Sequence, residues 1–370
     1  MASKESFLLN VPTSKKYLFL QKSGVKETPL RLLNLLQERK TNKSKALLSK
    51  LHKTLLESYG INISKTKTFA NLSSKLLQRF SPTLHWPQTK PHHLKIITKS
   101  FRGGNTWQNK FYGKRLYFYD VNSLYPFCFI NKLPKGSPKV LCNPTSLENI
   151  FGFVEAEVSP PNFIYYNITS PNQTKGLLKG VYFSEELKYL EKLNYTVTLK
   201  KAYAYKHTHN ITQDFLLHLY SKKKTFPKLI KFLLNASYGK LVLKGTLSPL
   251  LPLAAAVTSY ARIYMHRSAM CSPNPPIYSD VDSLIVQHPE INKTINTRKL
   301  GFFKNQITHT HTHINEAFFY KPRIYNITHN ITHIAKGNQP LHIDTHPNPK
   351  GLRSITINKK QVATIWISSL

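Results

Sequence analysis

The chain has 370 residues and a formal net charge of +36, from 53 Lys and Arg residues against 17 Asp and Glu residues. A chain of this length is expected to form two or three subdomains around a large core, and its distributed positive charge favours a polyanionic partner such as nucleic acid. No run approaches the roughly 18 apolar residues of a membrane span, and the cysteines show neither metal-site spacing nor a disulfide pattern, which excludes a membrane partner and a disulfide scaffold.

Residues 1–99 are basic, and apolar spacing predicts helices over 45–59 and 72–80. No aspartate precedes Asp120, so we expect this region to lack the carboxylates of a two-metal catalytic site. The N-terminal segment contains Glu5 and lacks the amphipathic, Arg-rich character of an import peptide. This favours synthesis inside an organelle, as does a composition rich in Lys, Ile, Asn and Tyr.

A loop at Phe101–Gly104 follows. Its paired glycines, Gly103 and Gly104, let the backbone approach a phosphate closely, and Arg102 supplies a positive charge. A plain turn is the alternative interpretation.

The apolar run Leu116–Tyr119 predicts a buried strand that carries Asp120 to its end. The residues after it turn toward a helix that brings the hydroxyl of Tyr125. A carboxylate at a strand end beside exposed backbone N–H groups suits Mg²⁺ bound to a triphosphate.

Residues 133–220 form a long insertion of alternating strands, with a helix that begins at Ser184 and has Glu185 and Glu186 in its first turn. The next strong pattern is a helix over Lys231–Gly239. Lys231, Asn235 and Tyr238 follow the spacing i, i+4, i+7, so one face offers a cation, an amide and an aromatic ring. An ordinary amphipathic helix is the alternative.

The segment Ile277–Val286 alternates like a strand or hairpin and places Asp280 and Asp282 on one face. Two neighbouring carboxylates repel each other unless a cation lies between them. Of the five aspartates in the chain, three fall here and at Asp120, as a two-metal phosphoryl-transfer site requires. A hairpin turn with solvated aspartates is the alternative.

The C-terminal third has two further patterns. His309, His311 and His313 alternate with threonine, but without cysteine or carboxylate partners nearby we interpret them as an exposed loop. The stretch from Tyr320 to Ile327 predicts a strand with Arg323 and Tyr325 on one face.

Three of these stretches, in this order, resemble motifs A, B and C of family B DNA polymerases. Motif A there reads D-x-x-S-L-Y-P and is matched by Asp120–Pro126. Motif B, K-x-x-x-N-S-x-Y-G, is matched by Lys231–Gly239 with Ala236 in place of Ser. Motif C, Y-x-D-T-D-S, is matched by Tyr278–Ser283 with Val281 in place of Thr.

The resemblance extends to the protein-primed branch, the replicases of certain phages and of linear mitochondrial plasmids. Ser100–Trp107 resembles its Y-x-G-G element, and Pro322–Tyr325 resembles its P-K-x-Y element with Arg323 in place of Lys. Leu300–Lys304 is similar to the segment that follows motif C there.

This resemblance implies an α+β, right-hand polymerase with an antiparallel-sheet palm, helical fingers and a reduced thumb. The expected parts are an N-terminal segment at 1–99, a loop and motif A at 100–132, an insertion at 133–220, the fingers at 221–240, the palm with motif C at 241–325 and the thumb at 326–370. The implied activity is DNA-directed DNA synthesis without proofreading in this chain.

The resemblance also implies roles for individual residues. Two Mg²⁺ ions, or Mn²⁺ in their place, would be held by Asp120, Asp282 and the carbonyl of Val121, with Asp280 in support. The implied nucleotide-binding residues are Leu124, Tyr125, Lys231, Asn235 and Tyr238. Those implied to bind DNA are Arg102, Gly103, Gly104, Ser123, Gly239, Arg323 and Tyr325.

A second phosphate-binding lysine would be Lys224 or Lys228, whereas we expect Lys222 and Lys223 to be solvated. The implied partners are template and primer DNA and dNTPs, with either a terminal protein or an existing 3′-OH as primer. The implied location is the mitochondrion, with the chromosome or a linear plasmid as replicon, or else a plastid. Two other interpretations stay open: an inactive truncated polymerase, and a basic DNA-binding protein without enzymatic activity.

Overall fold

The computed structural model describes residues 53, 56–57, 60–61, 69–80, 86–162, 168–169, 175–208, 212–224, 227–239, 241, 250–270, 275–289, 295–296, 298–306, 313–329, 332–336, 352–357 and 360–366. Most of the predicted helix over 45–59, together with His309 and His311, lies outside these residues. The chain divides into two compact units, Met1–Pro82 and Thr83–Leu370.

In the first unit, α5 (Phe69–Phe80) coincides with the helix predicted over 72–80. Its apolar residues recur at helical spacing, and Leu72 and Leu76 are buried. Arg79 lies in the last turn, where a positive charge is favourable to the helix dipole.

The second unit contains an eight-stranded sheet with the order β1-β7-β8-β2-β10-β11-β12, to which β9 adds by pairing with β2. The strands are β1 (Thr106–Gln108), β2 (Tyr112–Val121), β7 (Tyr278–Asp280), β8 (Ser283–Val286), β9 (Phe303–Asn305), β10 (Ile314–Lys321), β11 (Ile324–His329) and β12 (Thr332–Lys336). Every pairing is antiparallel, as expected for a palm.

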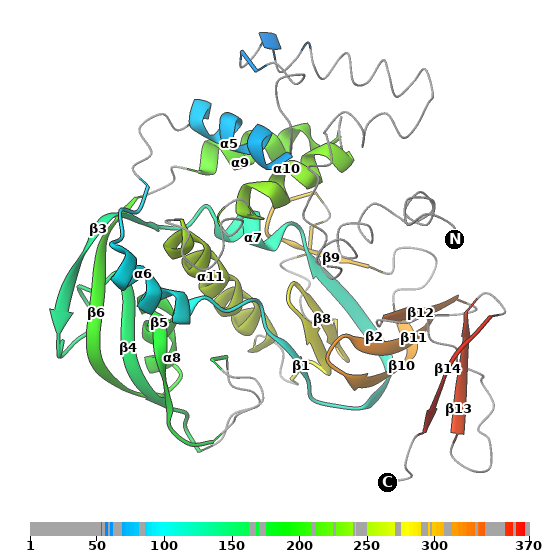
Figure 1. Cartoon of the computed structure of the whole chain (residues 1–370). Helices are drawn as coiled ribbons and strands as arrows, with labels where there is room; N and C mark the ends of the chain where they lie inside the picture. The colour runs from blue at the N-terminus through cyan, green and yellow to red at the C-terminus, as the bar shows by residue number, and fades with distance from the viewer. Residues whose placement is uncertain are drawn as a thin grey trace, which may run out of the picture. The chain divides into compact units, whose positions relative to one another are not determined.

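Strand β2 is the centre of this sheet (Figure 1). Its first half pairs with β10, from Tyr112 to Leu116. Its second half pairs with β8 on one edge and with β9 on the other, so its C-terminal end lies between two strands from the last hundred residues. Leu116 anchors the strand in an apolar core that includes Phe319 and Ile327.

A second, four-stranded sheet has the order β3-β6-β4-β5 and fills the predicted insertion. Its strands are β3 (Leu133–Cys142), β4 (Gly152–Ser159), β5 (Leu178–Phe183) and β6 (Thr196–Thr208), and α8 (Ser184–Glu191) packs on it. Val154, Leu187 and Leu190 belong to its core. The insertion is therefore a subdomain with its own apolar core.

Helix α11 (Leu251–Met270) lies between the two sheets in Figure 1. Ile263 joins the core of the four-stranded sheet, whereas Tyr264 packs on Phe303 of the palm. Both sides of the helix are thus covered, which explains why it is apolar almost all round.

The remaining helices of this unit pack against α11 or against one another. They are α6 (Pro91–Ile97) with the short 3₁₀ helix η2 (Thr98–Ser100), α7 (Leu124–Cys128), α9 (Gln213–Ser221) with the 3₁₀ turn η3 (Lys222–Lys224), and α10 (Pro227–Gly239). The predicted motif B helix is α10, and it ends at Gly239 as expected. Together α9, η3 and α10 form the helical counterpart of the fingers.

At the C-terminus β13 (Leu352–Ile357) and β14 (Lys360–Trp366) form a separate antiparallel hairpin. Within the described part of the chain, no helix has both the length and the apolar character to cross a membrane.

Candidate active site

The palm sheet brings Asp120 and Asp282 to one place. Asp120 stands opposite Ser283 of β8 and opposite Lys304 of β9 in the strand register. The backbone N–H of Val121 donates to the carbonyl oxygen of Asp282 at 2.8 Å. Motif A and motif C are therefore joined by a main-chain hydrogen bond beside their carboxylates.

The predicted common strand face for Asp280 and Asp282 is wrong. A tight turn separates β7 from β8: Val281 has a φ of 57°, and the N–H of Asp282 donates back to the carbonyl oxygen of Asp280. Thr106 donates to Oδ1 of Asp280 at 3.0 Å, and Arg323 contacts the same oxygen at 3.3 Å. Asp280 is 5% exposed and takes part in this internal contact.

The glycine loop packs directly on motif C. The N–H of Val281 donates to the carbonyl oxygen of Asn105 at 2.9 Å. A Cβ added to Gly104 would lie 2.6 Å from a methyl carbon of Val281 and 3.1 Å from the hydroxyl of Tyr125, whereas a Cβ added to Gly103 would meet nothing within 4 Å. Of these two glycines, only Gly104 must lack a side chain, because its neighbours leave no room for a Cβ.

Tyr125 of motif A contacts both the glycine loop and motif B. Its hydroxyl oxygen accepts a hydrogen bond from the N–H of Gly104 at 3.2 Å. Its ring stacks on Tyr238 of α10, with centroids 4.7 Å apart and planes at 13°. Burial raises the pKa of Tyr125, and the nearby charge of Asp282 raises it further. The phenol is therefore neutral and can act as a rigid wall.

The backbone at Ser123 explains how Tyr125 reaches this place. Ser123 has a φ of 56°, which few residues other than glycine adopt, and it precedes the first turn of α7. This conformation reverses the chain directly after Asp120 and Val121. Leu124, the first residue of α7, is 2% exposed and anchors the helix.

Lysines from three elements lie around Asp120. On α10, Lys231 and Asn235 are exposed. The ammonium of Lys304 lies 2.7 Å from Oδ2 of Asp120. Lys223 is half-buried rather than solvated as expected, and its pKa is lowered by burial and by the charges of Lys304 and Lys231. The side chains of Lys224 and Lys228 lie outside the described residues.

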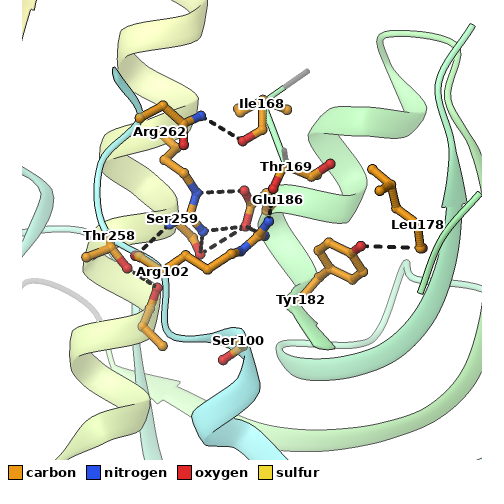
Figure 2. A network of polar contacts seen from close by, with 12 residues as sticks. Ser100, Arg102, Ile168, Thr169, Leu178, Tyr182, Glu186, Thr258, Ser259 and Arg262 are labelled. Atoms are coloured by element: carbon orange, nitrogen blue, oxygen red, sulfur yellow. Dashed lines mark hydrogen bonds and ion pairs between the residues drawn. The ribbon is translucent and has the colours of Figure 1, made fainter. Parts of the chain in front are cut away.

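Arg102 does not present its charge to solvent as a phosphate ligand would. Its guanidinium donates to the carbonyl oxygen of Thr169, contacts Oε2 of Glu186 at 3.3 Å and lies 5.0 Å from the centre of the Tyr182 ring (Figure 2). The guanidinium that was predicted to bind DNA therefore interacts with groups of the protein itself in this structure.

Figure 2 shows the buried ion pair at the centre of this network. Arg262 of α11 donates from Nε to Oε1 of Glu186 at 2.8 Å and from Nη2 to Oε2 at 2.7 Å, and both side chains are fully buried. Burial opposes charge on Glu186, but Arg262 and Arg102 outweigh it and hold its pKa below the ordinary value. Nη1 of Arg262 donates to the carbonyl oxygens of Arg102 and Gly103.

Arg323 and Tyr325 do not share a strand face, contrary to expectation. Arg323 lies in the turn between β10 and β11 with a φ of 65°, and its N–H donates to the hydroxyl of Tyr278 at 2.7 Å. Tyr325 is 6% exposed and packs edge-on against Tyr278. Tyr325 is therefore a core residue that supports the strand of Asp280.

The donor set at the end of β2 suits a hard divalent ion. Asp120 and Asp282 supply carboxylate oxygens, and Val121 supplies a backbone carbonyl from the same turn. Among the described residues no cluster of three His, Cys, Asp or Glu side chains forms a complete cage. Mg²⁺ is commonly held by one or two carboxylates with water and substrate phosphates completing its sphere, so these residues fit it.

Several residues at this site carried little signal in the sequence. Lys304 ends a segment that was matched only to the stretch after motif C, Glu186 lies in the first turn of a predicted helix, and Arg262 lies within the long helix α11. The charge of Arg262 inside that helix was the one available indication, because a buried cation needs a partner.

Comparison with known proteins places this arrangement among polymerases. Residues 42–246, more than half of the chain, match the family described as DNA polymerase type B, organellar and viral. A probable DNA polymerase of Ascobolus immersus is 23% identical over 75% of this chain and 28% of its own length. A probable DNA polymerase of Podospora anserina is 32% identical over 49% of this chain and 16% of its own length. This chain thus spans less than a third of either relative.

Solved structures show the same fold. Phi29 DNA polymerase complexed with single-stranded DNA superposes with a TM-score of 0.65 at 20% identity, over 85% of this chain and 66% of that one. Its ternary complex with primer-template DNA and incoming nucleotides superposes with a TM-score of 0.60 at 19% identity, over 80% and 62%. The expectation of an α+β palm with helical fingers is confirmed.

Proposed function

Because this chain belongs to the organellar and viral type B DNA polymerases, we propose that it adds deoxynucleotides to a primer 3′-OH under the direction of a DNA template. The observation that carries the proposal is the meeting of Asp120 and Asp282 at the end of β2, fixed by the 2.8 Å hydrogen bond between Val121 and Asp282. A fold similar to that of the phi29 complexes supports it.

Asp120, Asp282 and the carbonyl of Val121 hold two Mg²⁺ ions, or Mn²⁺ in their place. When bound, the ions lower the pKa of the attacking hydroxyl and neutralise charge on the leaving pyrophosphate. Asp280 is a positioning residue, because its contacts with Thr106 and Arg323 hold the turn that carries Asp282.

Lys231 binds the triphosphate and neutralises the charge that develops as the α–β phosphate bond breaks. Lys223 replaces Lys224 or Lys228 as our candidate for the second phosphate ligand. Its half-buried position near Lys231 supports this, because desolvation strengthens its attraction to phosphate.

The nucleotide's sugar and base lie against Tyr125 and Tyr238. The stacked rings form a flat wall that excludes a 2′-OH, and the buried Leu124 precedes Tyr125 at the start of α7. Asn235, exposed on the same face of α10 as Lys231, contacts the nascent base pair.

The DNA backbone approaches the open side of the glycine loop at Gly103, together with Ser123 and Gly239. A Cβ at Gly103 or Gly239 would meet nothing within 4 Å, which leaves room for a phosphate there. The net charge of +36 favours such binding along the chain.

Membership in an organellar and viral family, with fungal relatives, supports action in the mitochondrion on organellar DNA or a linear plasmid. Protein priming is the mode of initiation that we propose. A terminal protein would then supply the first hydroxyl in place of a DNA 3′-OH.

Primer extension on a singly primed template, with Mg²⁺ and dNTPs, tests the proposal. We expect Asp120→Asn and Asp282→Asn each to reduce extension more than about a hundredfold. Asp214→Asn is the matched control, since Asp214 is exposed on α9 and should extend at the wild-type rate. Wild-type extension by Asp282→Asn would contradict the proposal.

The same experiment separates the other interpretations. A wild-type protein that melts cooperatively and binds DNA but extends no primer would be an inactive polymerase remnant. DNA binding that weakens with salt and is indifferent to Mg²⁺, again without extension, would indicate a DNA-binding protein only.

A further inference from the structure

Lys304 makes a contact that the proposed reaction does not use. Strand β9 pairs with β2 so that Lys304 stands opposite Asp120, and directly opposed residues of an antiparallel pair project on the same face. Its Nζ lies 2.7 Å from Oδ2 of Asp120. The contact is thus set by the backbone register of two strands and not by the chance meeting of surface side chains.

The environment of the pair makes the contact consequential. The Asp120 side chain is 19% exposed and that of Lys304 is 34% exposed, so solvent screens their attraction only in part. The oxygen that Lys304 contacts, Oδ2 of Asp120, is one of the few oxygen atoms at this site that could bind a divalent ion. Lys304 must therefore leave Oδ2 before Asp120 can offer both oxygens to a metal.

A bound triphosphate would offer the ammonium of Lys304 a second partner. Lys304 is close enough to Lys223 to lower its pKa, and Lys231 acts on Lys223 in the same way. The three ammonium groups repel one another unless anions are added. A triphosphate bound by Lys223 and Lys231 would supply such anions within reach of the flexible Lys304 side chain.

We propose that Lys304 exchanges partners during each cycle: it neutralises Asp120 in the empty site and moves to the polyphosphate when a metal–nucleotide complex enters. The proposal rests on the proposed function and adds to it a residue that couples nucleotide arrival to metal binding. Asp120 is then a strong metal ligand only when a nucleotide is present, which disfavours idle binding of metal.

The test measures binding rather than turnover. Free Mn²⁺ is followed by electron paramagnetic resonance as the full chain is titrated without nucleotide. We expect Lys304→Met and Lys304→Gln to bind Mn²⁺ about three- to tenfold more tightly than wild type. Agreement between these two neutral variants separates loss of charge from altered packing. Lys114→Met, which removes an exposed lysine from the same sheet, should match wild type.

The second titration adds a dNTP in the presence of Mn²⁺. We expect the two Lys304 variants to bind the nucleotide about three- to tenfold more weakly than wild type. Effects of opposite sign in the two titrations are the signature of exchange. Unchanged Mn²⁺ affinity, or tighter Mn²⁺ binding with undiminished nucleotide binding, would overturn the proposal.

Asp120→Asn distinguishes this failure from failure of the proposed function. If that variant binds Mn²⁺ as wild type does in the presence of dNTP, Asp120 is not a metal ligand and the proposed active site is wrong. If it loses Mn²⁺ binding in the presence of dNTP while the Lys304 variants behave as wild type in both titrations, the active site stands and only the exchange is refuted.

Discussion

Replacing Glu186 with glutamine should destabilise the protein severely, although the two side chains have nearly the same shape. Glu186 and Arg262 are fully buried and joined by hydrogen bonds of 2.8 and 2.7 Å, and Ser259 donates to the same carboxylate at 3.1 Å. Glutamine would remove the negative charge and turn N–H donors toward the donors of Arg262. A buried guanidinium left without its counter-charge costs about 3–5 kcal/mol of folding free energy.

Glu185→Gln is the matched control, one residue away on α8. Glu185 is partly exposed and pairs with Lys188 at 2.9 Å one turn along the helix. Such a pair contributes less than about 1 kcal/mol. Urea unfolding followed by circular dichroism gives the free energy of unfolding of each variant. A difference of less than about 1 kcal/mol between Glu186→Gln and Glu185→Gln would refute the reasoning.

The pH dependence provides an independent check. The folded pKa of Glu186 lies below its ordinary value of 4.5, so its contribution is complete above pH 4.5 and is lost as the pH falls through the folded pKa. We therefore expect the stabilities of wild type and Glu186→Gln to converge in acid. A constant difference between them across this range would mean that the ion pair is not the cause.

Three further predictions concern the packing around the site. Gly104→Ala should destabilise the protein by about 1–3 kcal/mol in urea unfolding and raise the KM for dNTP in steady-state extension, because its methyl group would collide with the motif C turn. Gly103→Ala is the control for stability and should leave the free energy of unfolding unchanged, because a methyl group there would meet open space. Tyr238→Ala should weaken dNTP binding, measured by fluorescence titration, because Tyr125 loses a stacking contact worth about 0.5–1.5 kcal/mol. Unchanged dNTP affinity would mean that Tyr125 is not part of the nucleotide-binding site. Burial lowers the pKa of His266 from 6.5 to about 4, so His266 is protonated in the unfolded chain at a higher pH than in the folded one. The free energy of unfolding of wild type should therefore fall by about 3 kcal/mol as the pH drops between those values. His266→Gln should lack this loss, and an equal pH dependence of stability in both proteins would contradict the prediction.

The buried network gives the glycine loop a physical connection to the insertion. Nη1 of Arg262 holds the carbonyl oxygens of Arg102 and Gly103, while its other nitrogens hold Glu186 of the insertion. Gly104 in turn contacts Tyr125 and Val281. Tyr125 is thus linked through the glycine loop and Arg262 to Glu186, a residue of the insertion that is remote in sequence from motifs A, B and C.

Two helices and one strand were predicted correctly from patterns of neighbouring residues. Apolar spacing located α5, helical spacing located α10, and the apolar run before Asp120 located β2. Helical spacing placed Lys231 and Asn235 on one exposed face. These predictions succeeded because turn chemistry and side-chain periodicity act within a few residues along the chain.

Contacts between distant segments could not be predicted in this way. Nothing in the local pattern indicates that Arg102 turns inward to Thr169 and Glu186, or that Arg323 leaves its strand to meet Asp280. Each depends on which strands or helices become neighbours, and a turn at Val281 decided the direction of Asp282.

The sequence by itself determined the chemistry available to this protein. It shows which carboxylates lie at strand ends, which lysines lie before and on α10, and which family's motifs these residues match. Only the tertiary structure decided which charges meet. Lys304 faces Asp120 because β9 adds to the free edge of β2, and Glu186 is buried because α8 packs against α11. The reason is physical: hydrophobic patterning fixes an element and its buried face, whereas the pairing of those faces is a property of the whole fold.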